Sequence, residues 1–230
     1  KVREIMDDTG TFPVGDWLHT FCNEMIRREY NRRVTLDCNM RFGALSADEY
    51  KLMKKAGFRF MLFGLESANQ ATLDRLNKNL RVEQILEGAE AATKAGLDVH
   101  VTVMFGYPWE TANDMANTVK LARELLARGY AYTLQVTRVI SYPGTPLFRE
   151  AEEKGWLTTH NWNDFDMRRN VMKCDAGEDE INNAIRKVYR GFIQPSALYN
   201  RIVHTRHPVD DIRFYMRGMK SLIGHLRDFK

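Results

Sequence analysis

Charged side chains follow short apolar segments at three places in the first third of this sequence. Asp7 and Asp8 follow the first segment, Arg41 follows the second, and Glu66 and Ser67 follow the third. Carboxylates accept hydrogen bonds from ammonium and hydroxyl groups, and a guanidinium group binds a carboxylate. These residue types therefore indicate a site for a zwitterionic, hydroxylated ligand.

Two later apolar segments end in turns that contain glycine and proline. One runs into GYPWET from Gly106, and the other runs through Arg138 and Val139 into SYPGTP. A glycine lets a ligand approach the backbone closely, and an exposed backbone can pair with the edge of an adenine ring. The ligand predicted by the charged residues could therefore also carry a nucleobase.

Each charged residue also has a simpler interpretation. Asp7 and Asp8 are typical of a turn, and together with Glu66 they could bind Mg²⁺, although adjacent acids form a weak metal-site pattern. Glu66 alone could lie at a helix N-terminus, where a carboxylate interacts favourably with the helix dipole. The residues share a function only if the fold brings them together.

The glycines predict the elements that would position these residues. Three segments each consist of a helical pattern, a glycine and an apolar strand, and their glycines Gly57, Gly96 and Gly129 are typical of left-handed helix C-caps. Strands that alternate with helices form a parallel sheet, which binds ligands where its strands end. We expect strands over residues 2–6, 33–39, 58–63, 98–105 and 131–140.

Helix starts are marked as well. Ser46 and Glu49 have the spacing of a capping box, and Thr145 precedes Pro146 as a cap residue precedes a first-turn proline. Asp16 is a candidate cap for the first helix. Beyond about residue 156 the sequence turns polar, and helical patterns over 178–200 and 208–228 predict a C-terminal helical appendage.

Composition excludes some classes of protein. The 230-residue chain has a net charge of +4, from 34 basic and 30 acidic residues, and this excess does not favour nucleic-acid binding without a basic cluster. No run of about 18 apolar residues exists, so no membrane span is expected. Cys22, Cys38 and Cys174 are widely spaced, which indicates reduced thiols in a cytoplasmic protein.

Five motifs in order resemble the radical S-adenosylmethionine (radical SAM) superfamily. They are DDTGTFP, CNMRFGAL, FGLESANQATLDRLNK, KAGLDVHVTVMFGYPWET and YPGTPLFREAEEKGW, and the similarity spans about residues 3–157. They are most similar to the branch with an upstream cobalamin-binding domain, which includes the anaerobic Mg-protoporphyrin monomethyl ester oxidative cyclase and many methyltransferases.

The resemblance implies a fold and cofactors. The fold is a partial (β/α) TIM-like barrel of parallel strands over residues 1–157, and residues 158–230 are a helical C-terminal extension. The cofactors are S-adenosylmethionine and a [4Fe–4S] cluster, with cobalamin in the full-length protein. The implied partners are a small-molecule substrate and an electron donor such as flavodoxin or ferredoxin.

The resemblance also implies residues that bind S-adenosylmethionine. The first two acids match the position that binds its ammonium group, and the arginine matches the position for its carboxylate. Glu66 and Ser67 match positions that meet the ribose. Met104 and Gly106 match a segment that passes the adenine, and Val139 matches a position that packs on it. In chain order these residues are Asp7, Asp8, Arg41, Glu66, Ser67, Met104, Gly106 and Val139.

The sequence departs from the family in two ways. It has no CxxxCxxC segment, so we expect a piece that begins after the cluster loop and cannot assemble the cluster alone. Trp109 stands in GYPWET where a glycine is common, next to the acid Glu110 that closes the pattern.

The expected function is cleavage of S-adenosylmethionine to a 5′-deoxyadenosyl radical. The radical would serve oxidative ring closure of a tetrapyrrole ester or a related cobalamin-dependent reaction such as methyl transfer. Two alternatives stay open. One is a Mg²⁺-dependent (β/α)-barrel lyase that uses Asp7, Asp8 and Glu66, and the other is a non-catalytic barrel that binds S-adenosylmethionine or a nucleotide.

Overall fold

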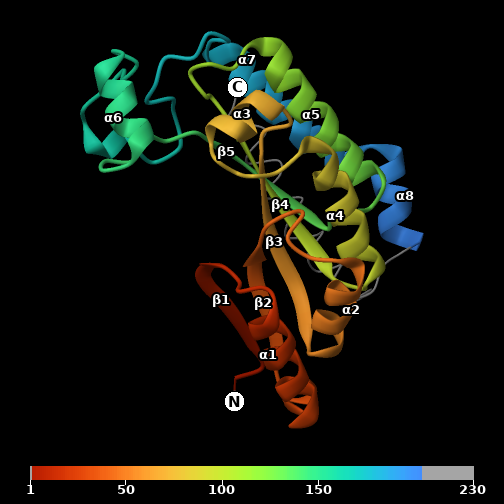
Figure 1. The fold of residues 1–230 in the computed structure, drawn as a ribbon. Coiled ribbons are helices and arrows are strands. Elements are labelled where there is room, and N and C mark those ends of the chain that lie inside the picture. Colours follow the sequence, from red (N-terminus) through yellow and green to blue (C-terminus); the bar gives the residue numbers. More distant parts are fainter. Residues whose placement is uncertain (1, 204–230) are drawn as a thin grey trace. The chain divides into compact units, whose positions relative to one another are not determined.

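A computed structural model describes residues 2–203, and the helix expected over 208–228 lies outside this range (Figure 1). Strands and helices alternate through β5, and helices follow it. The elements are β1 (Glu4–Thr11), α1 (Asp16–Arg27), η1 (Tyr30–Arg32), β2 (Thr35–Met40), α2 (Ala47–Lys55), β3 (Phe58–Glu66), α3 (Gln70–Arg75), α4 (Val82–Lys94), β4 (Asp98–Phe105), α5 (Ala112–Ala127), β5 (Thr133–Arg138), α6 (Pro146–Glu153), η2 (Trp162–Asp164), α7 (Glu178–Arg190), η3 (Gly191–Ile193) and α8 (Pro195–Val203).

The five predicted strands form one open sheet in the order β1-β2-β3-β4-β5. The β1–β2 and β2–β3 pairs are parallel, as strand–helix alternation predicts. This arrangement confirms the predicted class, a partial barrel with a helical C-terminal region. The structure extends the first strand to Thr11 and the third to Glu66, beyond the predicted ends.

Most of the predicted helix ends are confirmed. Ser46 and Glu49 form the reciprocal capping box, and Thr145 caps α6 with Pro146 in its first turn. The prediction for Asp16 is wrong, because Gly15, at φ 73°, is the N-cap and no side chain caps the helix. Asp16 is the first helical residue, where its carboxylate still matches the helix dipole.

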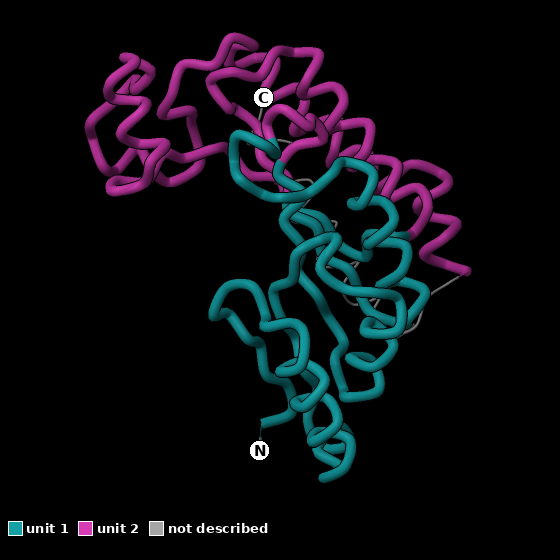
Figure 2. Tube along the Cα trace, viewed as in Figure 1, with its two compact units in different colours: residues 1–66, 73–102, 130–135 teal, residues 67–72, 103–129, 136–230 magenta. Residues whose placement is uncertain are grey.

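Figure 2 shows that the chain forms two compact units. Unit 1 comprises residues 1–66, 73–102 and 130–135, and unit 2 comprises 67–72, 103–129 and 136–230. The predicted domain boundary at residue 157 stays a prediction. Within residues 2–203 no helix is long and apolar enough to cross a membrane.

Strands β3 and β4 have one buried face and one half-buried face. On β4, Val99 and Val101 are buried, whereas His100 and Thr102, which alternate with them, are partly exposed. Successive side chains of a strand point to opposite faces, so this alternation separates an apolar face from a polar one. The polar face of unit 1 is therefore the face on which a polar ligand can lie.

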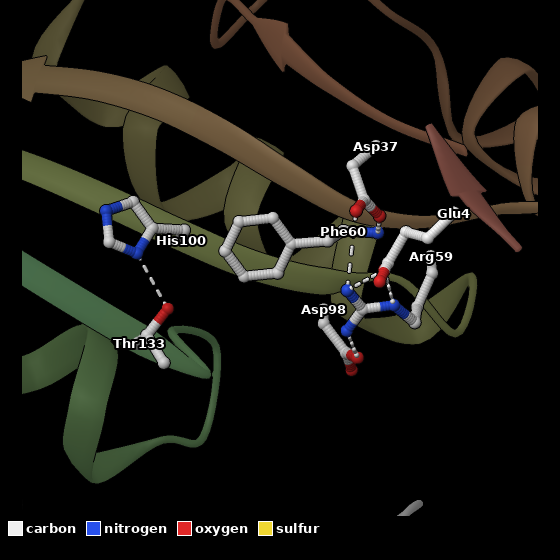
Figure 3. A network of polar contacts seen from close by, with 7 residues as sticks. All are labelled: Glu4, Asp37, Arg59, Phe60, Asp98, His100 and Thr133. Atoms are coloured by element: carbon white, nitrogen blue, oxygen red, sulfur yellow. Dashed lines mark hydrogen bonds and ion pairs between the residues drawn. The ribbon is translucent and has the colours of Figure 1, made fainter. Parts of the chain in front are cut away.

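Figure 3 shows an ionic network in unit 1 that joins four strands. In the pairing of β2 with β3, Leu36 lies opposite Phe58, but the next residue, Asp37, lies opposite Phe60. Arg59 is therefore an extra residue that forms a β-bulge. Its guanidinium group lies 3.4 Å from Asp37, 3.7 Å from Asp98 on β4, and forms an ion pair with Glu4 on β1. The bulge thus turns one cation toward three carboxylates.

This network changes the acidity of its members. Burial, followed by the hydrogen bond with Glu4, raises the pKa of Asp37 to about 6. The hydrogen bond with Asp37 holds the pKa of Glu4 below its ordinary value. The Phe60 N–H donates to Asp37 Oδ1 at 3.1 Å, so the Asp37 carboxyl group also satisfies the backbone at the bulge.

Unit 2 has a separate helical core. Helix α5 packs against α7 and α8, and buried residues such as Leu125, Ile181 and Val188 fill the space. Arg138, at the end of β5, is 3% exposed and donates a hydrogen bond to Asn170 Oδ1 at 2.7 Å. Arg138 therefore anchors the segment before α7 to the sheet within this unit.

Candidate functional site

A polar cavity of about 230 Å³ opens in unit 1 where β1, β2 and β3 end. It contains two of the site residues predicted from the sequence, Arg41 and Glu66. This volume is below the range of roughly 300–1,000 Å³ typical of small-molecule sites, so the cavity suits one end of a larger ligand. Its lining is Gly10, Thr11, Asn39, Met40, Arg41, Phe42, Leu62, Gly64, Glu66, Lys78, Leu80 and Thr102.

Glu66 ends β3 in a left-handed backbone conformation, with φ at 60°. Its Oε1 lies 2.7 Å from Lys78 Nζ, and the Glu66 side chain is 14% exposed. A Cβ on Gly64 would clash with this oxygen, so glycine at position 64 lets the carboxylate lie where it does. The chain therefore builds a half-buried ion pair into the cavity wall.

Arg41 lies just after β2, and its guanidinium group donates a hydrogen bond to the Lys78 carbonyl oxygen. This bond holds the Arg41 side chain beside Lys78, so two cations and one carboxylate line the same cavity. Such a set can bind a carboxylate through the cations and a hydroxyl or ammonium group through Glu66.

Lys78 was missed by the sequence analysis. It follows α3 in the segment LNKNL, between Asn77 and Asn79, which both have left-handed φ angles near 50°. Two asparagines around a lysine indicate a turn, but the return of that turn to the end of β3 depends on tertiary packing. The sequence alone therefore gave no reason to pair Lys78 with Glu66.

The two adjacent acids lie in different surroundings. In the pairing of β1 with β2, Asp7 lies opposite Cys38, and the next paired residue of β1 is Thr11, opposite Asn39. The three residues between them bulge out of the pairing, and Asp8 is one of them. Both acids therefore lie within β1 and not in a loop after it. Asp8 Oδ1 accepts a hydrogen bond from Asn39 Nδ2 at 3.0 Å, and Asn39 lines the polar cavity.

Asp7 instead lines a second cavity of about 510 Å³, which is mostly aromatic and aliphatic and includes Phe12, Trp17 and Phe58. Its Oδ1 accepts hydrogen bonds from the backbone and the hydroxyl group of Thr9, at 2.9 and 2.6 Å, and these hold its pKa below the ordinary value. Asp7 therefore shapes the local turn, and the two acids do not line the same cavity.

Ser67 lies in unit 2 and is fully buried. Its hydroxyl group donates to Glu110 Oε1 at 2.5 Å and accepts hydrogen bonds from the Asn69 backbone and side-chain amides, at 3.2 and 3.0 Å. These partners use the hydroxyl proton and both lone pairs. A ligand could contact Ser67 Oγ only by replacing one of them.

The three predicted adenine contacts also lie in unit 2. Gly106 directly follows β4 with φ at 102°, a conformation that favours glycine. The Val139 N–H donates to the Phe105 carbonyl oxygen at 2.9 Å, and Val139 is buried. Met104 is partly exposed, and its sulfur accepts a hydrogen bond from Tyr107 at 3.7 Å.

The described cysteines do not form an iron–sulfur site. Cys22 and Cys38 are fully buried, and burial raises the pKa of their thiols to about 11 and about 12. Cys174, in unit 2, donates to the Tyr107 carbonyl oxygen at 3.2 Å. Across residues 2–203 no group of three or more histidines, cysteines or acids could hold a metal ion, so these residues do not fit the cluster or the Mg²⁺ alternative.

Comparison with known proteins identifies relatives by sequence. A methyltransferase of Pyrococcus horikoshii, described as uncharacterised, is 32% identical over 154 residues, which cover 66% of this chain and 33% of that protein. Bacteriochlorophyllide d C-8(2)-methyltransferase of Chlorobaculum tepidum is 28% identical over 130 residues, 56% of this chain and 28% of the relative. The anaerobic magnesium-protoporphyrin IX monomethyl ester cyclase of Rubrivivax gelatinosus is 27% identical over 183 residues, which cover 77% of this chain and 31% of that protein.

Solved structures share the fold. The apo form of the cobalamin-dependent S-adenosylmethionine radical enzyme OxsB matches 97% of this chain and 39% of its own, with a TM-score of 0.61 and 13% identity. Elp3 of Methanocaldococcus infernus matches 84% of this chain and 45% of its own, with a TM-score of 0.57 and 19% identity. At these identities the likeness shows the fold alone.

The chain spans about a third of the length of the curated relatives that it matches. A family model described as the radical SAM superfamily matches residues 6–122, which include β1 to β4 and most of α5. Enzymes of this superfamily use S-adenosylmethionine and a [4Fe–4S] cluster. The match covers half of the chain, and the chain therefore belongs to the radical SAM superfamily.

Proposed function

We propose that this chain binds S-adenosylmethionine, with the amino-acid end of the molecule in the polar cavity of unit 1. The observation that carries the proposal is the Glu66–Lys78 ion pair beside Arg41 in that cavity. A zwitterionic amino acid needs cations for its carboxylate and an acceptor for its ammonium group. The superfamily match makes S-adenosylmethionine the ligand of this kind to test first.

Each cavity residue has a separate task in this proposal. Arg41 and Lys78 bind the carboxylate, and Asp8 with Asn39 accepts the ammonium group. When the ligand carboxylate takes over Lys78, the Glu66 carboxylate is released to accept the ribose hydroxyl groups. Asp7 supports the turn that presents Asp8, which follows from its bonds to Thr9.

For unit 2, taken by itself, we propose a part in nucleotide binding. Gly106 offers backbone without a side chain, and Met104 and Val139 offer apolar surface at the ends of β4 and β5. Ser67 acts indirectly, because its hydroxyl group is occupied by Glu110 and Asn69. In this proposal the described residues bind the nucleotide, and they do not include the ligands of the iron–sulfur cluster.

For the complete protein we propose methyl transfer to carbon in a small-molecule substrate, with flavodoxin or ferredoxin as electron donor. Two of the three relatives above are named methyltransferases, which supports methyl transfer over ring closure. Anaerobic turnover with methyl-labelled S-adenosylmethionine separates the two reactions. Label in the product is the expected result, and label that stays in methionine would overturn methyl transfer in favour of oxidative cyclisation.

Calorimetric titration of S-adenosylmethionine tests the binding site. Glu66→Gln and Lys78→Met should each weaken binding about tenfold or more, because each removes a charge-assisted hydrogen bond worth about 1.5–3 kcal/mol. Glu83→Gln is the matched control, since Glu83 is an exposed member of a surface ion pair with Arg81. Unchanged affinity in both cavity variants would remove the cavity from the binding site.

A further inference from the structure

A buried carboxyl group joins two loops of unit 2. Glu110 follows β4 by a few residues and is 1% exposed. Its Oε1 accepts hydrogen bonds from Ser67 Oγ at 2.5 Å, Thr72 Oγ1 at 2.8 Å and Asn69 Nδ2 at 3.3 Å. The three donors come from the segment 67–72, and Figure 2 shows this segment and the loop after β4 in the same unit.

All of these donors meet one oxygen of the carboxyl group. The second oxygen, Oε2, has no hydrogen-bond partner among the residues that the structure describes. An ionised carboxylate would leave negative charge on an unpaired buried oxygen, whereas a neutral carboxyl group has a much smaller desolvation penalty. Burial also raises the pKa of Glu110. Burial and the unpaired oxygen therefore favour the neutral acid at this site, whereas the three hydrogen bonds to Oε1 favour the ionised form.

The carboxyl group also sets the direction of its neighbours. A hydroxyl group has a single proton, and Ser67 and Thr72 each give theirs to Glu110. The Thr72 oxygen can then accept the indole N–H of Trp109 at 3.2 Å. Trp109 in turn stacks on Tyr107, with ring centroids 5.2 Å apart. The loop that begins at Gly106 is thus held through a chain of hydrogen bonds that starts at Glu110.

We propose that Glu110 is a positioning residue for the nucleotide: it clamps the segment 67–72 to the loop 106–110 and so fixes the backbone at Gly106. Glu110 does not touch the ligand in this role, because both loops enclose it. The inference rests on the proposed function, since Gly106 matters for binding only if the adenine passes there. It also explains the tryptophan in GYPWET, because Trp109 gains a partner in Thr72.

The test uses the complete natural protein and three substitutions. Glu110→Gln keeps the shape of the neutral acid, Glu110→Asp keeps the carboxyl group but withdraws its oxygens from the three donors, and Thr72→Val removes one donor without changing volume much. Two readouts are measured: the Kd for S-adenosylmethionine and the ¹⁵N-indole resonance of Trp109, which is assigned with Trp109→Phe. Glu124→Gln is the control, because Glu124 pairs with Arg128 on the surface of α5.

The clamp predicts an unusual order among the variants. Glu110→Gln should bind within about threefold of wild type, whereas Glu110→Asp and Thr72→Val should bind about tenfold more weakly and shift the Trp109 resonance. Glu110→Asp that binds like wild type while Glu110→Gln fails would overturn the neutral clamp. An unmoved Trp109 resonance in all three folded variants would overturn the clamp altogether.

The two proposals fail in different ways. If the wild-type protein and the Glu124→Gln control do not bind S-adenosylmethionine, the proposed function is wrong, and the Trp109 resonance still reports on the clamp. If the wild type binds and Glu110→Asp binds equally well with a normal thermal unfolding curve, the clamp is wrong and the proposed function stands.

Discussion

Replacing Asp37 with asparagine should remove from unit 1 one contribution to stability that falls as the pH rises from about 4 to about 6. Asp37 lies in the ionic network of Arg59, where burial and Glu4 raise its pKa from 3.8 to about 6. The folded state therefore holds this proton more tightly than the unfolded state does. Consequently the contribution of Asp37 to the free energy of unfolding is fully present below about pH 4 and is lost as the pH rises to about 6.

The size of the effect follows from the shift. A change of about two pKa units corresponds to roughly 3 kcal/mol. Glu4 titrates together with Asp37, and its lowered pKa opposes the change, although Glu4 is about half exposed and contributes little. We therefore expect the stability of the wild type relative to that of the Asp37→Asn variant to fall by roughly 1–2 kcal/mol across the window. The asparagine is always neutral, and its Oδ1 still accepts the Phe60 N–H, so the variant lacks only this contribution. Groups that both proteins share, such as His100 with its lowered pKa and opposite slope, cancel in the difference.

Urea unfolding at intervals from about pH 4 to about pH 8 measures this difference. Asp48→Asn is the control, because Asp48 is an exposed member of a surface pair with Lys51 and should keep the wild-type pH dependence. A wild-type stability that rises relative to that of the Asp37→Asn variant through the window would refute the reasoning. So would an Asp37→Asn variant whose stability falls with pH as steeply as that of the wild type.

Three further outcomes are expected. Gly64→Ala should weaken S-adenosylmethionine binding about tenfold in calorimetry, because the new Cβ displaces the Glu66 carboxylate; wild-type affinity would show that this carboxylate is not needed. Ser46→Ala should lower the free energy of unfolding by about 1 kcal/mol through loss of the capping box, and an unchanged value in urea would disprove the contribution of the cap. In NMR titrations the His100 ring should stay neutral above about pH 5, because burial lowers its pKa to about 4; a midpoint near 6.5 would contradict its burial beside Thr133.

The fold could be predicted because local signals repeat along the chain. Gly57, Gly96 and Gly129 have left-handed φ angles of 103°, 93° and 72°, so each ends a helix where its position in the sequence indicated. Apolar segments after them became β3, β4 and β5. Helix propensity, C-caps and strand composition all favour the same strand–helix alternation, which leaves few topologies open.

The site was predicted less completely because it depends on register. Asp7 and Asp8 are adjacent in sequence, but the irregular ladder between β1 and β2 places them in different surroundings. The bulge at Arg59 and the return of Lys78 to Glu66 likewise come from pairing between distant segments. The spacing of apolar and polar residues shows where a strand lies, but it does not show which residue of the neighbouring strand lies opposite. Sequence patterns therefore identify which strands carry charged residues and not which charged residues contact one another.

Buried polar residues were misjudged for a related reason. The resemblance implied that Ser67 meets the ribose, and it gave Glu110 only as the acid that closes GYPWET, and polar residues near turns are usually exposed. In the structure they satisfy each other in the interior of unit 2. Their burial depends on donors from the segment 67–72 meeting a loop about forty residues later, which neither segment shows alone.

A crystal structure of the complete protein with S-adenosylmethionine tests the central claim most directly. We expect the ligand carboxylate within hydrogen-bond distance of Arg41 and Lys78, with the Glu66–Lys78 pair opened and Glu66 turned to the ribose. A methionine moiety bound outside the polar cavity, with the 2.7 Å contact between Glu66 and Lys78 still intact, would contradict it.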